Sequence, residues 1–275
     1  MSLGIVDAVV LGVVEGLTEF LPVSSTGHLT IAEGLLGLDV DDPSVTAFTA
    51  VIQSGAILAV LLFFAKDIAR FARGAVAGLR SAAGRQGEDW TFTLAVVVGS
   101  LPIGVVGLLF RDVVKGPVLR SLVTVGIALI VWSAVMVLAE RRATQARGEA
   151  EVTVTDGLVI GLVQCIALVP GVSRSGATIS AGLLRGIDRV TATRMAFFLA
   201  IPALTAAGAL ELPSALGGGS GLAPVLVGTV VSFLVAYASI AFLLRFVASN
   251  SIVAFVPYRV VLGVVVLVVL GVRAA

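Results

Sequence analysis

Two polar breaks interrupt long apolar stretches of this 275-residue chain, and they decide its fold. The first reads Leu21-Pro22-Val23-Ser24-Ser25-Thr26-Gly27, and the second reads Val169-Pro170-Gly171-Val172-Ser173-Arg174-Ser175-Gly176. Proline removes an amide donor and glycine loosens a helix, so each break separates two helices. Non-helical backbone at membrane depth is tolerated only where it is buried in protein or lines a wet cavity. We therefore expect residues 3–37 and 154–187 to form two re-entrant helix-loop-helix elements.

The composition excludes a water-soluble protein. The chain is 58% hydrophobic and 13% charged, with a mean hydropathy of +1.12, whereas a soluble domain carries roughly 25% charged residues. A membrane crossing needs about 20 apolar residues. Six further stretches meet this requirement, at residues 44–65, 90–110, 118–140, 190–211, 222–247 and 253–272. We predict an all-α polytopic membrane protein with six transmembrane helices and two re-entrant elements, in a single membrane domain over residues 1–275.

An internal repeat relates the two breaks. Sliding the second region back by 149 positions pairs Gly12 with Gly161, Ser24 with Ser173 and Gly27 with Gly176. Each half, residues 1–145 and 150–275, then holds one re-entrant element and three crossings. An odd number of crossings places the halves in opposite orientations, and the shared site of such an inverted repeat lies near the midplane.

Lysine and arginine are distributed unequally between the two sides of the membrane. The poorer side holds four (Arg111, Lys115, Arg120 and Arg273). The richer side holds thirteen: Lys66, Arg70, Arg73, Arg80, Arg85, Arg141, Arg142, Arg147, Arg185, Arg189, Arg194, Arg245 and Arg259. The positive-inside rule makes the richer side cytoplasmic. Both termini and the mouth of the first re-entrant element are then expected to face outward.

Ionisable residues inside apolar segments are costly and need a reason. Glu15 and Glu19 are four residues apart, which places both carboxylates on one face of a helix. Two such carboxylates share a proton or bind a divalent cation such as Mg²⁺ or Ca²⁺. The structural alternative is an acid that is hydrogen-bonded to backbone or lines a proton path.

The only histidine and the arginine of the second break complete the candidate chemistry. His28 directly follows the first break, which can fold it back toward Glu19 for acid, base or nucleophilic chemistry, although a lone histidine is usually a packed side chain. Arg174 stands among small residues at the start of an apolar helix, where free amides, hydroxyls and a guanidinium favour phosphate. The alternative is a loop arginine paired with Glu15 or Glu19 for stability. Cys165 is the only cysteine, so no intrachain disulfide can form.

These motifs together resemble the bacterial undecaprenyl-diphosphate phosphatase family, also called the bacitracin-resistance protein. The resemblance rests on Glu15-x-x-x-Glu19 with residues 22–28 and on residues 170–178, and it covers essentially the whole chain. It implies hydrolysis of a C55 polyprenyl diphosphate to the monophosphate and inorganic phosphate, recycling of this lipid carrier for peptidoglycan synthesis, bacitracin resistance and a required divalent metal.

The resemblance also implies roles for particular residues. Catalysis falls to Glu19, Ser25, His28 and Arg174, and metal binding to Glu15 with Glu19. Glu19 and His28 are expected to activate a nucleophile that is water or Ser25, with a covalent intermediate on Ser25 or His28 left open. Substrate binding is expected from Ser24, Thr26, Gln53, Ser173, Ser175 and Thr178.

A lipid-carrier flippase or secondary transporter is the main alternative function, because paired broken helices in an inverted repeat are typical of carriers. The expected location is the bacterial cytoplasmic (inner) membrane, with an active site that opens to the periplasm. The expected partners are the polyprenyl diphosphate and membrane lipid. The sequence carries no nucleic-acid signature and leaves a homodimer open.

Overall fold

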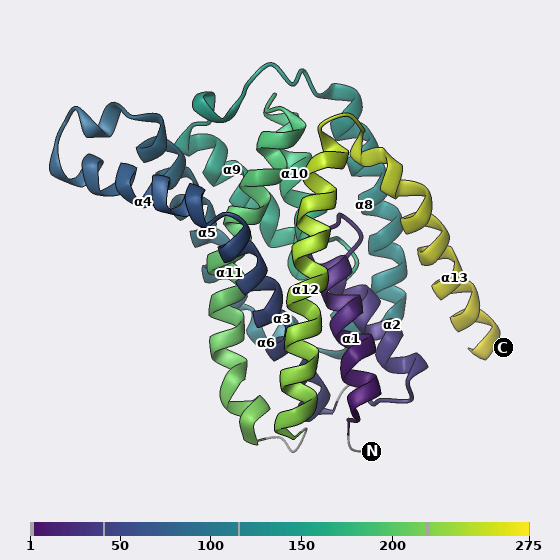
Figure 1. Cartoon of the computed structure of the whole chain (residues 1–275). Helices are drawn as coiled ribbons and strands as arrows, with labels where there is room; N and C mark the ends of the chain where they lie inside the picture. Colours follow the sequence, from purple (N-terminus) through teal and green to yellow (C-terminus); the bar gives the residue numbers. More distant parts are fainter. Residues whose placement is uncertain (1–2, 41, 115, 218–220, 275) are drawn as a thin grey trace.

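The computed structural model describes residues 3–40, 42–114, 116–217 and 221–274, which form a bundle of helices (Figure 1). No strand occurs among these residues, and an isolated bridge pairs Arg147 with Ile187. The α-helices are α1 (Ile5–Thr18), α2 (Ser25–Leu35), α3 (Pro43–Phe63), α4 (Ala65–Arg80), α5 (Glu88–Leu109), α6 (Arg111–Val114), α7 (Pro117–Arg120), α8 (Leu122–Arg142), α9 (Val154–Gln164), α10 (Arg174–Leu184), α11 (Arg189–Gly217), α12 (Leu222–Val247) and α13 (Val256–Ala274). The 3₁₀ helices are η1 (Gly84–Gln86), η2 (Glu149–Glu151), η3 (Cys165–Leu168) and η4 (Ile252–Phe255).

Five helices of the described chain are long and apolar enough to cross a membrane, which confirms an all-α polytopic membrane protein. They are α3, α5, α8, α12 and the segment Ile252–Val272 that includes η4 and most of α13. The expected crossing at residues 190–211 lies in α11, whose 29 residues give a length of about 43 Å. The side chains of α11 from residue 210 onward lie outside the described residues. The expected crossing at 118–140 begins later, because the Ser121 side chain accepts a hydrogen bond from the Thr124 amide and starts α8 after the separate short helix α7.

Two short helix hairpins occupy the predicted re-entrant regions. One consists of α1 and α2, and the other of α9 and α10. The first helices of the two hairpins begin 149 residues apart, at Ile5 and Val154, and so do the second helices, at Ser25 and Arg174. The helices of the two hairpins therefore begin at positions that the 149-residue repeat pairs with each other.

Each hairpin packs against a spanning helix of the other half. In α1, a Cβ atom on Gly12 would lie 2.7 Å from the Gly228 carbonyl oxygen of α12. In α9, a Cβ atom on Gly161 would lie 2.0 Å from the Gly99 carbonyl oxygen of α5. Glycine is therefore needed at both positions for backbones to approach this closely, as is usual between membrane helices. Each half therefore holds the hairpin of the other half through a close contact between backbones.

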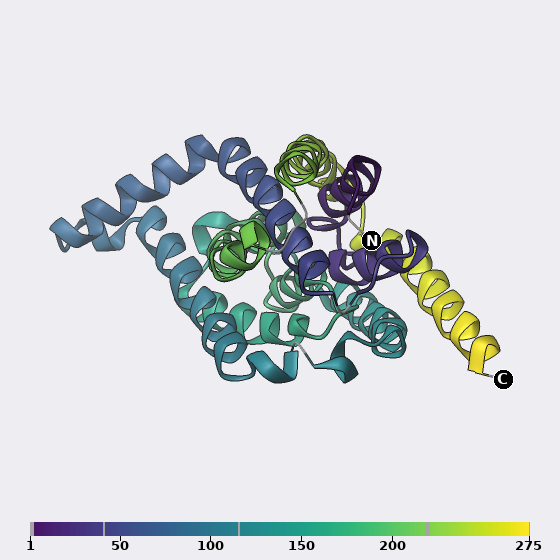
Figure 2. The same ribbon diagram turned by 90° about the horizontal axis from the view of Figure 1, so that it is seen from below.

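Two helices extend away from the bundle in both views (Figures 1 and 2). The helix α4 forms an arm on one side, and α13 lies on the opposite side, where it packs on α8 and η4. The connection between α8 and α9 lies at one end of the bundle, and the N-terminus lies at the other end (Figure 1).

Candidate active site

The two breaks adopt the same local structure. Ser24 and Ser173 cap the N-termini of α2 and α10 with positive φ values of 78° and 76°. The Ser24 hydroxyl accepts a hydrogen bond from the Gly27 amide at 3.4 Å, and the Ser173 hydroxyl accepts one from the Gly176 amide at 3.1 Å. A non-glycine residue with positive φ is uncommon and costs conformational energy. The chain accepts this cost twice, at positions 149 residues apart, to turn each break into a helix N-terminus.

The breaks contact each other inside the protein. The Gly171 amide donates to the Ser24 hydroxyl at 3.0 Å, and the Ser175 hydroxyl donates to the Leu21 carbonyl at 2.9 Å. Gly171 has a φ of +100°, and a Cβ atom there would lie 2.5 Å from the Val125 carbonyl oxygen of α8. The first turns of α2 and α10 therefore lie together, and their unpaired amides form two adjacent regions of positive potential.

Glu19 connects the two hairpins by charge. Its Oε1 atom accepts a hydrogen bond from Nη2 of Arg174 at 2.9 Å, and its Oε2 atom accepts one from the Ser25 hydroxyl at 2.6 Å. Arg174 also donates from Nη1 to the Ala196 carbonyl at 3.1 Å. Its buried Nε has no partner in the described part of the chain. The guanidinium thus has a donor left for a ligand, and Ser25 has an acceptor placed to take its proton.

Glu15 is the least satisfied polar side chain of the site. It is fully buried, and neither carboxylate oxygen has a hydrogen-bond partner among the described residues. The charges of Glu19 and Arg174 and the side-chain amide of Gln53 in α3 are near enough to interact with this carboxylate. A buried carboxylate without a hydrogen bond is costly.

A divalent cation fits this donor set. Within the described residues, no group of three or more histidine, cysteine or acidic side chains could hold a metal. Mg²⁺, however, is commonly held by one or two carboxylates with the remaining ligands supplied by substrate phosphates and water. Glu15 and Glu19 match this arrangement.

His28 lies at the edge of the site but does not bond Glu19. Its Nδ1 atom lies 2.7 Å from the Ser24 carbonyl oxygen one turn earlier, and its Nε2 atom lies 2.6 Å from the Tyr258 hydroxyl of α13. The two rings are stacked, with centroids 5.5 Å apart. Both ring nitrogens are therefore engaged, and the imidazole has a fixed orientation.

The remaining predicted binding residues divide into two groups. The hydroxyls of Ser24, Ser173, Ser175 and Thr178 bond to nearby backbone, with Thr178 donating to the Arg174 carbonyl at 2.9 Å. These hydroxyls shape the breaks. Thr26 is exposed on the first turn of α2. The structure thus brings together Glu15, Glu19, Ser25, Gln53 and Arg174, and it places Thr26 and His28 at the periphery.

Arg259 is counted above among the cations of the richer, cytoplasmic side, but the structure places it inside the protein. The side chain is fully buried and donates from Nη1 to the Pro22 carbonyl at 2.9 Å and from Nη2 to the Gly171 carbonyl at 2.9 Å and the Val172 carbonyl at 3.2 Å. Its Nε donates to the Ser133 hydroxyl at 3.1 Å. One cation on α13 therefore binds the backbone of both breaks. The count of twelve remaining cations against four leaves the predicted orientation unchanged.

The sequence did contain a signal for Arg259. It lies inside the apolar stretch 253–272, where an ionisable residue is as costly as Glu15 and Arg174 are in theirs and indicates a buried polar contact. Tyr258, the neighbour that bonds His28, had no comparable signal, because its partner lies 230 residues earlier in the chain.

The fold and the site together define a polytopic membrane protein with a buried, arginine-containing centre built from two broken helices. The family profile described as bacitracin resistance protein BacA matches residues 8–265. The chain belongs to this family.

Several curated proteins are similar over nearly the full length. The chain is 55% identical over 268 residues to "Undecaprenyl-diphosphatase 3" of Frankia casuarinae, covering 96% of each protein. It is 54% identical over 266 residues to "Undecaprenyl-diphosphatase" of Acidothermus cellulolyticus, again covering 96% of each. It is 53% identical over 266 residues to "Undecaprenyl-diphosphatase 1" of Streptomyces avermitilis, with the same coverage.

Proposed function

We propose that this chain is a membrane phosphatase that hydrolyses undecaprenyl diphosphate to undecaprenyl phosphate and inorganic phosphate. The names of its relatives state this activity, and the name of its family links it to bacitracin resistance. The observation in the structure that carries the proposal is the ion pair between Glu19 and Arg174, which unites an acceptor for a proton with a donor for phosphoryl oxygens.

Arg174 and the helix N-termini bind the diphosphate in this proposal. The free Nε of Arg174 donates to a phosphoryl oxygen, and the first-turn amides of α2 and α10 add partial positive charge. Phosphoryl transfer depends mainly on positioning and charge neutralisation, so this arrangement stabilises the transition state more than the ground state. A divalent cation, Mg²⁺ or Ca²⁺, held by Glu15 and Glu19 supplies further neutralisation of the phosphoryl oxygens when bound.

Glu19 activates the nucleophile. Its 2.6 Å hydrogen bond from Ser25 places a carboxylate to accept the hydroxyl proton as the Ser25 oxygen attacks the terminal phosphorus. The oxygen–phosphorus bond forms, the anhydride bond breaks, and undecaprenyl phosphate leaves. Water then releases phosphate from Ser25. In the alternative route, Glu19 takes the proton of a water that attacks directly.

Arg259 and Tyr258 are positioning residues in this scheme. Arg259 donates hydrogen bonds to carbonyl oxygens of both breaks and so fixes their backbone. Because the N–H of a peptide group points away from its carbonyl oxygen, the N–H groups of these peptides point away from Arg259. Tyr258 fixes the ring of His28. Both residues lie on α13, so this helix holds the two hairpins in register.

The proposed location is the bacterial cytoplasmic membrane, with both hairpins re-entrant and the first one opening to the periplasm. The excess of cations at the end that includes α4 and the α8–α9 connection supports this orientation.

Phosphate release from a C15 prenyl diphosphate by the purified, detergent-solubilised protein tests the activity. We expect turnover that EDTA abolishes and that Glu19→Gln and Arg174→Ala each reduce at least about 100-fold, a typical loss for an acid–base or oxyanion-stabilising group. Arg245→Ala, in the last turn of α12, is the control and should retain activity. Turnover that survives both site substitutions would remove this ion pair from the mechanism, and turnover in EDTA would remove the cation.

A further inference from the structure

The arm formed by α4 has an exposed face that neither the bundle nor the proposed reaction uses. Five side chains of this face, spaced four, three, four and three residues apart, lie on one stripe of the helix. All five are apolar and exposed, including Val76 at 44% and Leu79 at 72%. We name them the apolar stripe: Ala65, Ala69, Ala72, Val76 and Leu79.

Three cations run beside this stripe. Lys66, Arg73 and Arg80 recur every seven residues, and each directly follows a stripe residue, so they form a row about 100° around the helix. All three side chains are exposed, and none forms an ion pair in the part of the chain that the structure describes. We name them the basic row.

The opposite face of α4 is fixed to the body of the protein. Phe71 stacks on Phe92 of α5 with ring centroids 4.6 Å apart. A Cβ atom on Gly78 would lie 2.3 Å from the ring of Trp90, so this contact is also close. The apolar stripe is therefore not free to turn inward and bury itself.

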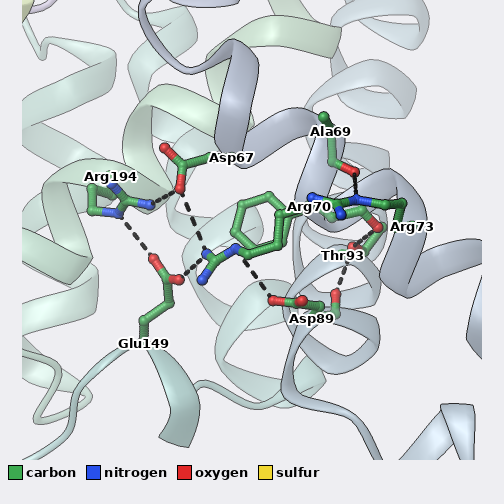
Figure 3. A network of polar contacts seen from close by, with 9 residues as sticks. Asp67, Ala69, Arg70, Arg73, Asp89, Thr93, Glu149 and Arg194 are labelled. Carbon is green, nitrogen blue, oxygen red and sulfur yellow. Dashed lines mark hydrogen bonds and ion pairs between the residues drawn. The ribbon is translucent and has the colours of Figure 1, made fainter.

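Ion pairs fix the same orientation (Figure 3). Arg70 of α4 pairs with Glu149 of η2 and lies 3.4 Å from Asp89 of α5. Asp67 of α4 pairs at 2.9 Å with Arg194 of α11, which also binds Glu149 at 2.9 Å. Asp67 is the only acidic residue of α4, and this pairing keeps it from neutralising the basic row. In Figure 3, Arg73 donates to the Ala69 carbonyl of its own helix and not to a carboxylate.

The position of α4 in the chain decides what faces the stripe. It begins at Ala65, directly after the spanning helix α3 ends at Phe63, and the chain returns into the membrane in α5. Because α4 lies between the ends of two helices that are long and apolar enough to span a membrane, we infer that it lies at the level where these helices leave the hydrocarbon. A 16-residue helix with an apolar stripe and flanking cations is typical of helices that lie in the membrane interface.

We propose that α4 is an interfacial helix that inserts its apolar stripe among the acyl chains and binds anionic phospholipid through Lys66, Arg73 and Arg80. Anionic headgroups complement a row of cations that has no carboxylate partner within the protein, and they attract such residues at the membrane surface. This site is separate from the Glu19–Arg174 centre and does not depend on the reaction proposed for that centre.

Lipid quenching in nanodiscs tests the proposal with the full chain. In a Cys165→Ser background, Leu79→Cys carries a fluorophore, and Ala146→Cys on the exposed α8–α9 connection carries the same fluorophore as a control. The nanodiscs hold phosphatidylcholine and phosphatidylglycerol in fixed proportion, and the bromine quencher is placed on the acyl chains of one lipid or the other at equal molar fraction. We expect strong quenching at position 79 and little at 146, with greater quenching when phosphatidylglycerol carries the bromine.

Matched charge variants show whether the basic row causes this preference. Arg73→Gln with Arg80→Gln should reduce the preference for phosphatidylglycerol at least about fivefold, the effect of roughly one basic residue at a membrane surface. Arg141→Gln with Arg142→Gln removes two exposed cations of α8 and should leave the preference unchanged. All four arginines lie outside the catalytic centre. The two double variants should therefore have the same thermal midpoint and the same rate of phosphate release as the unsubstituted protein, which checks that they are folded.

Three results would overturn the proposal. Absence of quenching at position 79 would mean that the acyl chains do not cover the stripe and that α4 does not lie in the membrane interface. Equal quenching by the two brominated lipids in the unsubstituted protein would remove the anionic specificity. If both double variants lost the preference for phosphatidylglycerol equally, the preference would arise from the net charge of the protein and not from the basic row.

Discussion

Replacing Arg259 with methionine should disable the enzyme although the residue touches neither reacting group. The guanidinium donates to the carbonyl oxygens of Pro22, Gly171 and Val172, which belong to the two breaks. Methionine fills similar apolar space but donates no hydrogen bond. Each buried carbonyl left without a donor costs about 1–3 kcal/mol. At the lower end, three carbonyls cost about 3 kcal/mol, which corresponds to a factor of about 100 in the equilibrium between the aligned and the misaligned arrangement of the breaks.

The expected result is a fall of about 100-fold in kcat with a smaller change in KM, because the breaks lose their alignment while the binding groups remain present. Misplacement of catalytic groups by about 1 Å has an effect of this size. Arg259→Lys retains the charge but not the planar fork, and it should recover part of the activity. Phosphate release from a C15 prenyl diphosphate measures both parameters, and thermal unfolding in detergent measures stability.

Arg245→Met controls for loss of a cation near the end of a spanning helix and should remain active. If Arg259→Met keeps a kcat within twofold of the unsubstituted protein, Arg259 does not hold the breaks in their active arrangement. A lower thermal midpoint with unchanged kcat would show that Arg259 stabilises the bundle without positioning the site.

Three further substitutions test other contacts. Glu15→Gln should raise the divalent-cation concentration needed for half-maximal activity at least tenfold, because an amide is a weaker ligand for such a cation than a carboxylate. An unchanged cation requirement would exclude Glu15 as a ligand. Tyr258→Phe preserves the ring stacked on His28 but removes the hydroxyl that bonds Nε2 of His28. We expect kcat to fall about tenfold with KM nearly constant. An unaltered kcat would mean that the bond between Tyr258 and His28 has no role in turnover. Asp156→Asn removes the buried carboxylate that pairs with Arg147 and Arg185, which should destabilise the protein by about 3 kcal/mol in detergent unfolding while the folded enzyme keeps its kcat. An unchanged thermal midpoint would argue against these ion pairs as stabilising contacts.

The sequence predicted the hairpins because their signals are local. Ser24 caps α2 and Ser173, 149 positions later, caps α10. A proline lies shortly before each serine, at Pro22 and at Pro170. The pairing of Glu19 with Arg174 could also be anticipated, because charged residues within apolar segments usually pair with one another.

The remaining features depend on contacts between distant segments. Arg259 donates to backbone carbonyls that are between 87 and 237 residues away in the chain. Every residue has a carbonyl oxygen, so the sequence does not indicate which ones bind a side chain. The expectation that His28 folds toward Glu19 missed Tyr258, because the orientation of an imidazole depends on which neighbour occupies its second nitrogen. The late start of α8 followed from a serine cap that the hydropathy of residues 118–140 does not reveal.

The central claim is that Glu19 and Arg174, from two different hairpins, act as one unit in phosphate release. A double-mutant cycle with Glu19→Asp and Arg174→Lys tests it while leaving measurable activity. Residues that act as a unit are strongly non-additive. We predict that kcat/KM of the double variant lies within about threefold of the more damaged single variant. Losses that multiply in the double variant would contradict the account, because they would show that the two residues contribute independently.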